Sequence, residues 1–483
     1  MSAAHSIAED DADGPLYAAS KKVYPQSVSG VYRRIKWILL CVTLGIYYIL
    51  PFVRWDRGPN EPHQAVLVDL GRRRFYFFFI EIWPQEIYYL TGLLIIAAMT
   101  LFLMNALAGR VWCGYLCPQT VWSDLFFQVE RLIEGDRRER MNKDAGPWTF
   151  QRGREKLTKH TIWLVIAWWT GGAWVLYFAD APTLVRQLAT LQAPAMAWIW
   201  IGILTFTTYV LAGFMREQVC LYMCPWPRIQ AAMIDESALN VTYRRDRGEQ
   251  RTSLKKATAL RAIGEHAGDC IDCHLCVAVC PTGVDIREGS QLGCIQCGLC
   301  IDACDSVMAK IGRPARLIAY DTETNVDRRR AGKANVFNPI RARTVLYVIV
   351  IALVGGIMTF ALATRADLDL SAIHDRNPMF VKTADGSIRN GYLIRIVNRA
   401  SADRTFEISV EGAQSPQLQA IGVEQAANGT LSAEVGPDQT RELRVTATLP
   451  GALNRPPSQD IAFRVTDMAS GRTAVARDHF EAP

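Results

Sequence analysis

The chain has 483 residues, of which 50% are hydrophobic and 21% are charged, and its formal net charge is +6. This composition excludes an intrinsically disordered chain, which combines low hydrophobicity with high charge. The charge pattern shows no concentrated basic stripe, so nucleic acid is not an expected partner. The 13 cysteines do not form a secreted disulfide scaffold, because 12 of them fall in four short motifs.

Five segments are apolar and long enough to cross a bilayer, which takes about 20 helical residues. They lie at about 35–53, 87–108, 161–179, 196–215 and 344–364. The loop 110–159 has ten Lys and Arg residues, whereas the link 180–195 has one. Because basic loops stay on the cytoplasmic side, the N-terminus, 110–159 and 216–343 are predicted to be cytoplasmic. An odd number of spans then places 365–483 on the outside.

These boundaries divide the chain into predicted regions. They are a cytoplasmic tail (1–34), a four-helix transmembrane region (35–215) with the cytoplasmic loop 110–159, a cytoplasmic region (216–343), a fifth transmembrane helix (344–364) and an outer domain (365–483). The outer domain contains four mostly alternating runs, at 392–397, 405–410, 443–449 and 461–465, which indicate strands. We expect a small β sandwich, and the absence of cysteine from it favours a stalk without chemistry of its own.

The strongest motif is a doubled cysteine run within a module at about 262–312. The two runs are Cys270-x2-Cys273-x2-Cys276-x3-Cys280-Pro281 and Cys294-x2-Cys297-x2-Cys300-x3-Cys304. This is the bacterial ferredoxin spacing, in which the fourth cysteine of each run ligates the other cluster. One [4Fe–4S] cluster is therefore predicted on Cys270, Cys273, Cys276 and Cys304, and a second on Cys294, Cys297, Cys300 and Cys280. Structural zinc is disfavoured, because it prefers isolated CxxC pairs.

Two further motifs match each other and follow the second and fourth predicted spans. They are Cys113-Gly-Tyr-Leu-Cys117-Pro118 and Cys220-Leu-Tyr-Met-Cys224-Pro225. The hairpins before them look like an internal duplication, which would bring both motifs together at the cytoplasmic membrane edge. Proline is a preferred first helical residue, and a helix N-terminus favours the thiolate. Thiolates select Cu(I), zinc or iron–sulfur, so the four cysteines are predicted to share one site; ordinary packing is the alternative.

Together, the five spans, the two CxxxCP motifs, the doubled ferredoxin run and the outer domain resemble the CcoG/FixG/RdxA family. The resemblance covers nearly the whole chain. It implies an α-helical membrane bundle with a ferredoxin-like α+β module and a C-terminal immunoglobulin-like sandwich, located in the bacterial inner membrane with the last domain periplasmic. Members of this family are associated with assembly of cbb-type haem–copper cytochrome oxidases and are implicated in reducing Cu(II) to Cu(I).

The resemblance implies a cupric reductase in which an unidentified cytoplasmic donor reduces two clusters. Electrons would then pass to Cu(II) near the four catalytic cysteines, Cys113, Cys117, Cys220 and Cys224. Oxidase assembly factors and a copper chaperone or transporter would be its partners. The membrane half also looks like the NapH and NosR polyferredoxins, which leaves open a conduit from quinol or a cytoplasmic donor without copper. A non-enzymatic scaffold for oxidase assembly is the third possibility.

Overall fold

The computed structural model describes residues 22–482 except 58–60, 84–85, 366–367, 401, 413–415, 427–428, 438 and 451–455. Most of the predicted tail 1–34 therefore lies outside the described residues. The chain forms two compact units, Met1–Val53 with Gln64–Gly355 and Arg54–His63 with Gly356–Pro483. The first unit contains all the cysteine motifs, and the second is mainly the C-terminal region.

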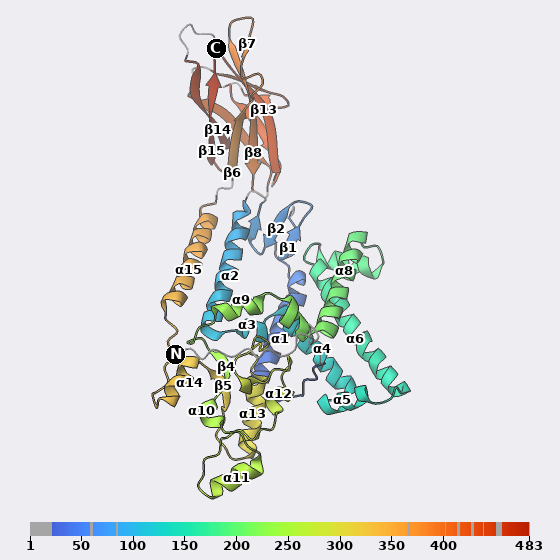
Figure 1. Cartoon of the computed structure of the whole chain (residues 1–483). Coiled ribbons are helices and arrows are strands. Elements are labelled where there is room, and N and C mark those ends of the chain that lie inside the picture. Colours follow the sequence, from blue (N-terminus) through green and yellow to red (C-terminus); the bar gives the residue numbers. More distant parts are fainter. Residues whose placement is uncertain are drawn as a thin grey trace, which may run out of the picture. The chain divides into compact units, whose positions relative to one another are not determined.

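Four helices in the described part are long and apolar enough to cross a membrane (Figure 1). They are α1 (Val31–Ile49) continued by η1 (Leu50–Phe52), α2 (Tyr88–Ala108), α8 (Ala195–Thr208) continued by the π-helical η3 (Tyr209–Met215), and α15 (Ala342–Ala363). Large apolar side chains on these helices are exposed, among them Leu346, Leu353 and Ile357 of α15. Helices satisfy their own backbone hydrogen bonds, so lipid can cover such faces. Four of the five predicted spans thus coincide with apolar helices.

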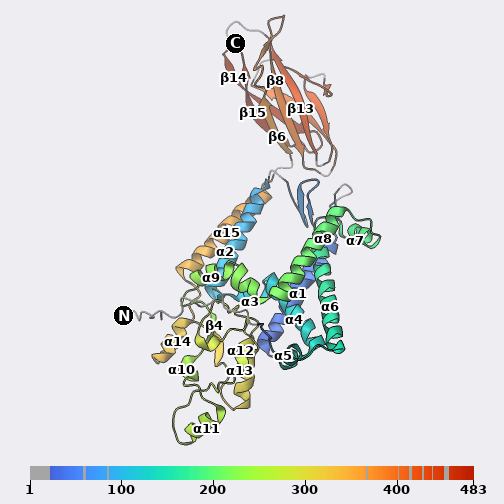
Figure 2. The same cartoon turned by 45° about the vertical axis from the view of Figure 1, so that its right-hand side comes forward.

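The predicted span 161–179 lies mostly in α6 (Phe150–Val175), which is not one of those four helices. The first half of α6 is charged, and its second half carries Trp, Thr and Gly among the aliphatic residues. Even so, α6 packs along α8, as Figures 1 and 2 show. The contact is close at Gly171, where a Cβ would lie 3.0 Å from the carbonyl oxygen of Ile201. The count of five spans therefore stays a prediction.

Short elements connect the long helices. The segment between α1 and α2 forms a three-stranded antiparallel sheet, and α7 lies between α6 and α8. Three helices follow α2 and lead into α6. The bounds are β1 (Val66–Asp69), β2 (Arg74–Phe77), β3 (Ile80–Ile82), α3 (Val111–Tyr115), α4 (Pro118–Glu134), α5 (Arg137–Ala145) and α7 (Ala181–Ala189).

The region between η3 and α15 is a small α+β module. Its two strands, β4 (Asn240–Tyr243) and β5 (Ile318–Asp321), pair antiparallel and bracket the doubled cysteine run. Val241 and Ile318 on these strands pack in one hydrophobic cluster with Cys270 and Cys276. The remaining elements are η4 (Val219–Met223), α9 (Trp226–Met233), α10 (Arg245–Gly248), α11 (Leu254–Ala262), α12 (Leu275–Ala278), η5 (Ile286–Glu288), α13 (Leu299–Lys310) and α14 (Glu323–Arg330).

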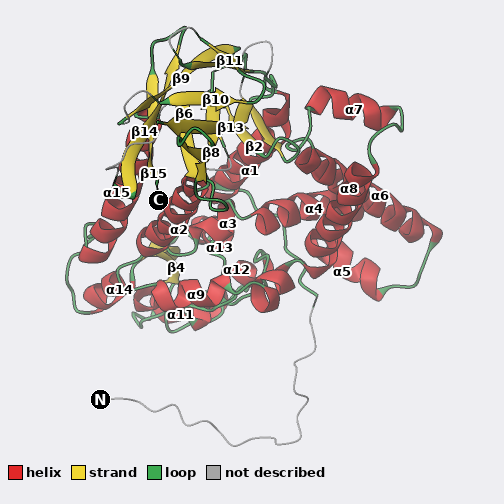
Figure 3. Ribbon diagram, turned by 90° about the horizontal axis from the view of Figure 1, so that it is seen from above, coloured by secondary structure: helices red, strands yellow, loops and turns green. Residues whose placement is uncertain are grey.

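The C-terminal region is all β in its described residues (Figure 3). Two five-stranded antiparallel sheets have the orders β10-β13-β8-β6, with β7 beside β8, and β11-β12-β9-β14-β15. Alternate residues such as Ile394 on β8 and Phe463 on β14 are buried in one shared core. All four predicted runs lie in strands, namely β8, β9, β13 and β14. The bounds are β6 (Leu368–His374), β7 (Val381–Lys382), β8 (Ile388–Asn398), β9 (Arg404–Glu411), β10 (Gln417–Ala420), β11 (Glu424–Gln425), β12 (Leu431–Val435), β13 (Gln439–Leu449), β14 (Ser458–Asp467) and β15 (Thr473–Glu481).

Candidate metal centres

The eight cysteines of the doubled run line two cavities. One cavity is lined by Cys270, Cys273, Cys276 and Cys304. The other is lined by Cys280, Cys294, Cys297 and Cys300, with Cys276 also in its wall. Each cavity thus receives three cysteines of one run and the fourth cysteine of the other. This is the crossed arrangement that the spacing predicts for a pair of [4Fe–4S] clusters.

The two runs follow the same backbone path. Positive φ angles occur two and four residues after the first cysteine of each run: 56° at Asp272 and 53° at His274, then 56° at Gln296 and 73° at Gly298. Such left-handed residues are uncommon outside glycine, so their repetition at equivalent positions marks a duplicated loop. Each loop curls tightly and presents three thiols to one cavity.

Burial sets the protonation of these thiols. It raises the pKa of Cys276, Cys294 and Cys304 to about 12 in each case. Without a metal they are neutral thiols at neutral pH, and bound iron would replace their protons. Cys273 differs from them, because it is exposed. The donor set, four thiols around each cavity, therefore fits two iron–sulfur clusters.

Among the residues that the structure describes, no group of three or more His, Cys, Asp or Glu side chains is arranged to hold a single metal ion. A cubane takes each thiolate on a different iron, so its ligands stand farther apart than those of a mononuclear site.

The two CxxxCP motifs have equivalent structures. Cys113 lies in α3 and Cys117 caps the N-terminus of α4, while Cys220 lies in η4 and Cys224 stands just before the N-cap of α9. In both motifs the N–H of the second cysteine donates to the carbonyl five residues back. The N···O distances are 2.9 Å from Cys117 to Trp112 and 2.8 Å from Cys224 to Val219.

The equivalence extends toward the preceding helices. Four residues before the first cysteine of each motif, the backbone has a positive φ, 55° at Gly109 and 44° at Arg216. Each of these residues ends a long apolar helix segment, α2 in one half and η3 in the other. The structure therefore contains two copies of the same unit: apolar helix, left-handed cap, CxxxCP turn and following helix. This repetition agrees with the internal duplication expected from the sequence.

The structure brings the four CxxxCP cysteines together. Burial raises the pKa of Cys113 to about 12, and the charges of Cys117, Cys220 and Cys224 contribute in the same direction. Burial also raises the pKa of Cys220 to about 12, again with a contribution from Cys117 and Cys224. All four side chains are half-buried. They form one cluster, which we call the four-cysteine site.

The four-cysteine site lies against the second cavity of the doubled run. A Cβ at Gly114 would stand 2.7 Å from the carbonyl oxygen of Ile295, so only glycine allows this approach. The hydroxyl of Tyr115 donates to the carbonyl of Cys297 at 2.9 Å. In the other motif, Leu221 contacts Gly293. Both CxxxCP turns therefore contact the run that begins at Cys294.

Arg110 is a functional residue that the sequence analysis missed. It is buried, and its guanidinium donates to the carbonyls of Leu292 and Pro227. Burial lowers the pKa of Arg110, and the neighbouring Cys113 and Cys294 act on it in the opposite direction. It forms no ion pair with a carboxylate within the described part of the chain. The sequence feature that could have identified Arg110 is its position between a long apolar segment and a CxxxCP motif.

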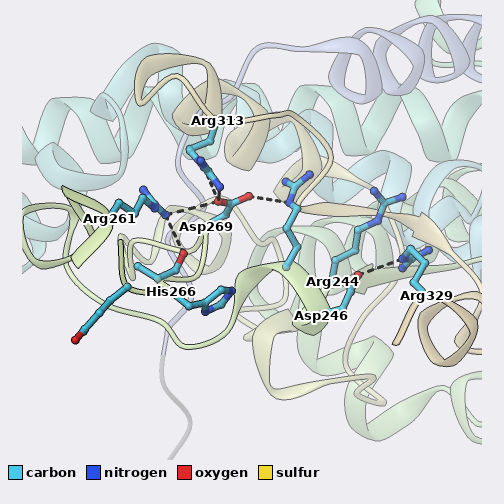
Figure 4. A pocket seen from close by; sticks show the side chains of 10 residues that line it. Arg244, Asp246, Arg261, His266, Asp269, Arg313 and Arg329 are labelled. Atoms are coloured by element: carbon cyan, nitrogen blue, oxygen red, sulfur yellow. Dashed lines mark hydrogen bonds and ion pairs between the residues drawn. The ribbon is translucent and has the colours of Figure 1, made fainter. Parts of the chain in front are cut away.

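An arginine-lined cavity of about 510 Å³ flanks the first cysteine run (Figure 4). At its centre Asp269, which is 1% exposed, directly precedes Cys270. Its carboxylate pairs with the guanidinium groups of Arg247 at 3.0 Å, Arg261 at 3.6 Å and Arg313. These ion pairs anchor Asp269, the residue directly before Cys270, to three arginines of the module.

A second buried ion cluster joins the helices around the four-cysteine site. Glu130 on α4 is 2% exposed and pairs with three cations from three elements. The distances are 2.9 Å to Arg140 on α5, 3.4 Å to Lys159 on α6 and 2.6 Å to Arg216 after η3. Arg216 is the left-handed residue that ends η3 in the second repeat. Its ion pair with Glu130 therefore fixes the position of this helix end.

Comparison with known proteins divides the chain in the same way. A family model described as a 4Fe-4S dicluster domain matches residues 215–323. Another, described as a 4Fe-4S binding domain, matches residues 90–135. A third, described as an IG-like fold at the C-terminal of FixG, matches residues 358–483.

Three curated proteins align along most of the chain. "Nitrogen fixation protein FixG" of Rhizobium meliloti is 47% identical over 97% of this chain and 94% of that protein. "Protein RdxA" of Cereibacter sphaeroides is 50% identical over 86% of this chain and 89% of that protein. "Protein RdxB" of the same organism is 52% identical, over 83% and 84%.

Proposed function

Because the chain belongs to the family of FixG, RdxA and RdxB, we propose that it is an electron-transfer protein of the bacterial inner membrane that reduces Cu(II) to Cu(I). The reduced copper would serve assembly of the copper centre of a cbb-type cytochrome oxidase. The iron–sulfur character and the apolar helices follow from the matched domains and the described fold. The reduction of copper is the part that we propose beyond these findings. The observation that supports it is the contact between the four-cysteine site and the second cavity.

The two cavities supply the ligands of two [4Fe–4S] clusters, which when bound store and transfer single electrons. Cys270, Cys273, Cys276 and Cys304 hold one, and Cys280, Cys294, Cys297 and Cys300 hold the other. The first cavity reaches the surface at the exposed Cys273, where a soluble donor can approach. In the second, Cys297 is buried and its carbonyl receives the hydroxyl of Tyr115 beside the CxxxCP turn. The arrangement thus defines a path for electrons, from the protein surface toward the four-cysteine site.

Copper is the substrate of the last step. Each Cu(II) takes one electron and becomes Cu(I), the ion that soft thiolate ligands prefer. Cys113, Cys117, Cys220 and Cys224 are the residues proposed to carry this step. A copper chaperone or transporter would then accept Cu(I) by exchange between thiolates. Assembly factors of the oxidase would be further partners.

A second candidate function is a conduit that passes electrons to a membrane partner without binding copper. Two of the matched domains are described by 4Fe-4S binding, which this function uses as well. In this case the four-cysteine site would still transfer electrons, but its acceptor would be another redox protein.

An anaerobic experiment separates these functions. The purified, cluster-loaded protein is reduced, freed of excess reductant and mixed with Cu(II) and a Cu(I)-specific chelator. Reoxidation of the clusters with a matching amount of the Cu(I) chelate would support copper reduction. Alanine at all four CxxxCP cysteines should abolish the chelate signal while the absorbance from the doubled run persists. Reduced clusters that ignore Cu(II) would favour the conduit, and unchanged oxidase assembly after cluster removal would favour a scaffold.

A further inference from the structure

The ligand count of the N-terminal 4Fe–4S region is incomplete. The matched 4Fe-4S binding domain covers residues 90–135, which contain only two cysteines, Cys113 and Cys117. Cysteine-ligated cubane clusters are held by four thiolates. The structure supplies the missing pair from the second repeat, Cys220 and Cys224, because the thiol of Cys113 donates to Oε1 of Gln230 on α9, the helix that follows Cys224, at 3.3 Å.

The four-cysteine site shares its physical properties with the two cavities of the doubled run. Its four cysteines are half-buried and lie on two equivalent turns, just as the ferredoxin cysteines lie on two equivalent loops. Two of its members stand at the starts of α4 and α9, where the helix dipole stabilises a thiolate. Four thiols from two matching turns are the donor set of a cubane cluster.

Charge balance gives an independent argument. A buried cation is costly unless it is paired, yet Arg110 has no carboxylate partner among the described residues. Its guanidinium lies between the two sets of cysteines, because it donates to the carbonyl of Cys294 at 3.4 Å and to the carbonyl of Pro227, just after Cys224, at 2.6 Å. Neutral thiols would leave the guanidinium uncompensated, whereas four thiolates around a cluster give a net negative centre. Arg110 would then lie between two anionic centres and be paired with both.

We propose that Cys113, Cys117, Cys220 and Cys224 hold a third [4Fe–4S] cluster. This inference rests on the proposed function for the identity of the acceptor, but the cluster itself can be tested without copper. It changes the predicted role of these cysteines: they bind the centre that reduces copper, and Cu(II) meets this centre without being ligated by the four thiols.

The test is an iron and acid-labile sulfide count on the full-length protein, purified anaerobically in detergent. Three cubanes predict about 12 irons and about 12 sulfides for each chain, and two predict about 8 of each. Replacing the four cysteines with serine should lower both counts by about 4. Cys41→Ser, at an exposed position in α1 outside every motif, is the matched control and should leave both counts unchanged.

A second measurement guards against misfolding of the fourfold variant. Cys224→Ser alone should remove one cluster signal from the electron paramagnetic resonance spectrum of the reduced protein and leave the signals of the doubled run unchanged. About 8 irons in the unmodified protein, with the spectrum unaltered by Cys224→Ser, would overturn the proposal. Stoichiometric copper or zinc at the site would overturn it as well. About 12 irons in a protein that does not reduce Cu(II) would support the third cluster and reject the copper function. About 8 irons in a protein that does reduce Cu(II) would reject the third cluster and support the copper function.

Discussion

Two glycines determine how closely the metal centres approach each other. Gly114 has no room for a Cβ because of the backbone at Ile295 and Cys297. Gly109 combines a positive φ with side-chain oxygens of Asn240 and Gln296 within 2.6 Å of an ideal Cβ. Neither residue bears a reactive group, so motif reasoning passed over both. Their role is visible only when segments nearly 200 residues apart are placed side by side.

Gly114→Ala should slow electron transfer to Cu(II), because a longer distance between the second cavity and the CxxxCP turn weakens the electronic coupling between them. The added Cβ would stand 2.7 Å from the Ile295 carbonyl oxygen and push the CxxxCP turn away from the second cavity. Stopped-flow mixing of the reduced protein with Cu(II) measures the rate. Gly172→Ala is the control, because its Cβ meets nothing within 4 Å. Equal rates in both variants would show that the close approach is unimportant.

Glu130→Gln should lower the free energy of unfolding by about 3–5 kcal/mol, the usual cost of breaking a buried ion pair. The change leaves Arg140, Lys159 and Arg216 without their common carboxylate. Thermal unfolding of the protein in detergent, followed by circular dichroism, measures the loss. Glu139→Gln, at an exposed position on α5, should unfold like the unmodified protein. A variant at Glu130 as stable as this control would contradict the assigned role.

The carboxylate of Glu130 should also make the stability of the fold sensitive to acid. Burial raises the pKa of Glu130, but Arg216, Lys159 and Arg140 outweigh it, and the pKa lies below its ordinary value. A group with a lowered folded pKa stabilises the fold above its unfolded pKa, near 4.3, and loses that contribution as pH falls through the folded value. The stability difference between the unmodified protein and Glu130→Gln should therefore shrink below about pH 4. A difference that is constant between pH 7 and pH 3 would contradict this.

At the scale of elements, the repeated CxxxCP turn explains what sequence reasoning could and could not predict. The spacing of Cys113 and Cys117, and the proline after them, predicted a helical turn followed by a helix start, as found. The crossed ferredoxin sets followed from spacing in the same way. The left-handed cap was not predictable, because one repeat uses Gly109 and the other Arg216. Arg110 was also missed, because its partners are backbone carbonyls distant in sequence.

Arg110→Met should lower the reduction potential of the centre held by the run at Cys294. Removing a buried positive charge beside this centre destabilises its reduced, more negative form, and we expect a fall of roughly 60 mV, a tenfold change for one electron. Spectroscopic redox titration of the purified protein measures it. Arg110→Lys keeps the charge and should recover part of the potential. If Arg110→Met and Arg110→Lys had equal reduction potentials, the charge of Arg110 would have no effect on the centre. Its role would then be the hydrogen bonds that it donates to backbone carbonyls.

At the scale of the whole molecule, amino-acid composition alone does not determine how many times the chain crosses the membrane. Apolar length predicted the helices at 87–108, 196–215 and 344–364 well, because lipid-facing helices are uniformly apolar. It is less decisive for α6, whose charged first half continues into a Trp- and Gly-rich half that packs on α8. Packing supplies a further argument. Gly114 and Ile295 lie in contact. This contact favours a topology in which both CxxxCP motifs lie on one side of the membrane and α6 crosses together with α8.

The predicted topology of five crossings would place the last domain and the cysteine sites on opposite sides of the membrane. We therefore expect a membrane-impermeant thiol reagent, added to intact spheroplasts, to label Ala469→Cys in the last domain but not Thr258→Cys on α11. Both positions are exposed, and Cys41→Ser provides a background without the lone cysteine of α1. If α6 did not cross, four spans would return residues 365–483 to the side of the N-terminus, and Ala469→Cys would be protected. That result would also set Cys113 and Cys294 on opposite sides, against their contact through Gly114 and Arg110.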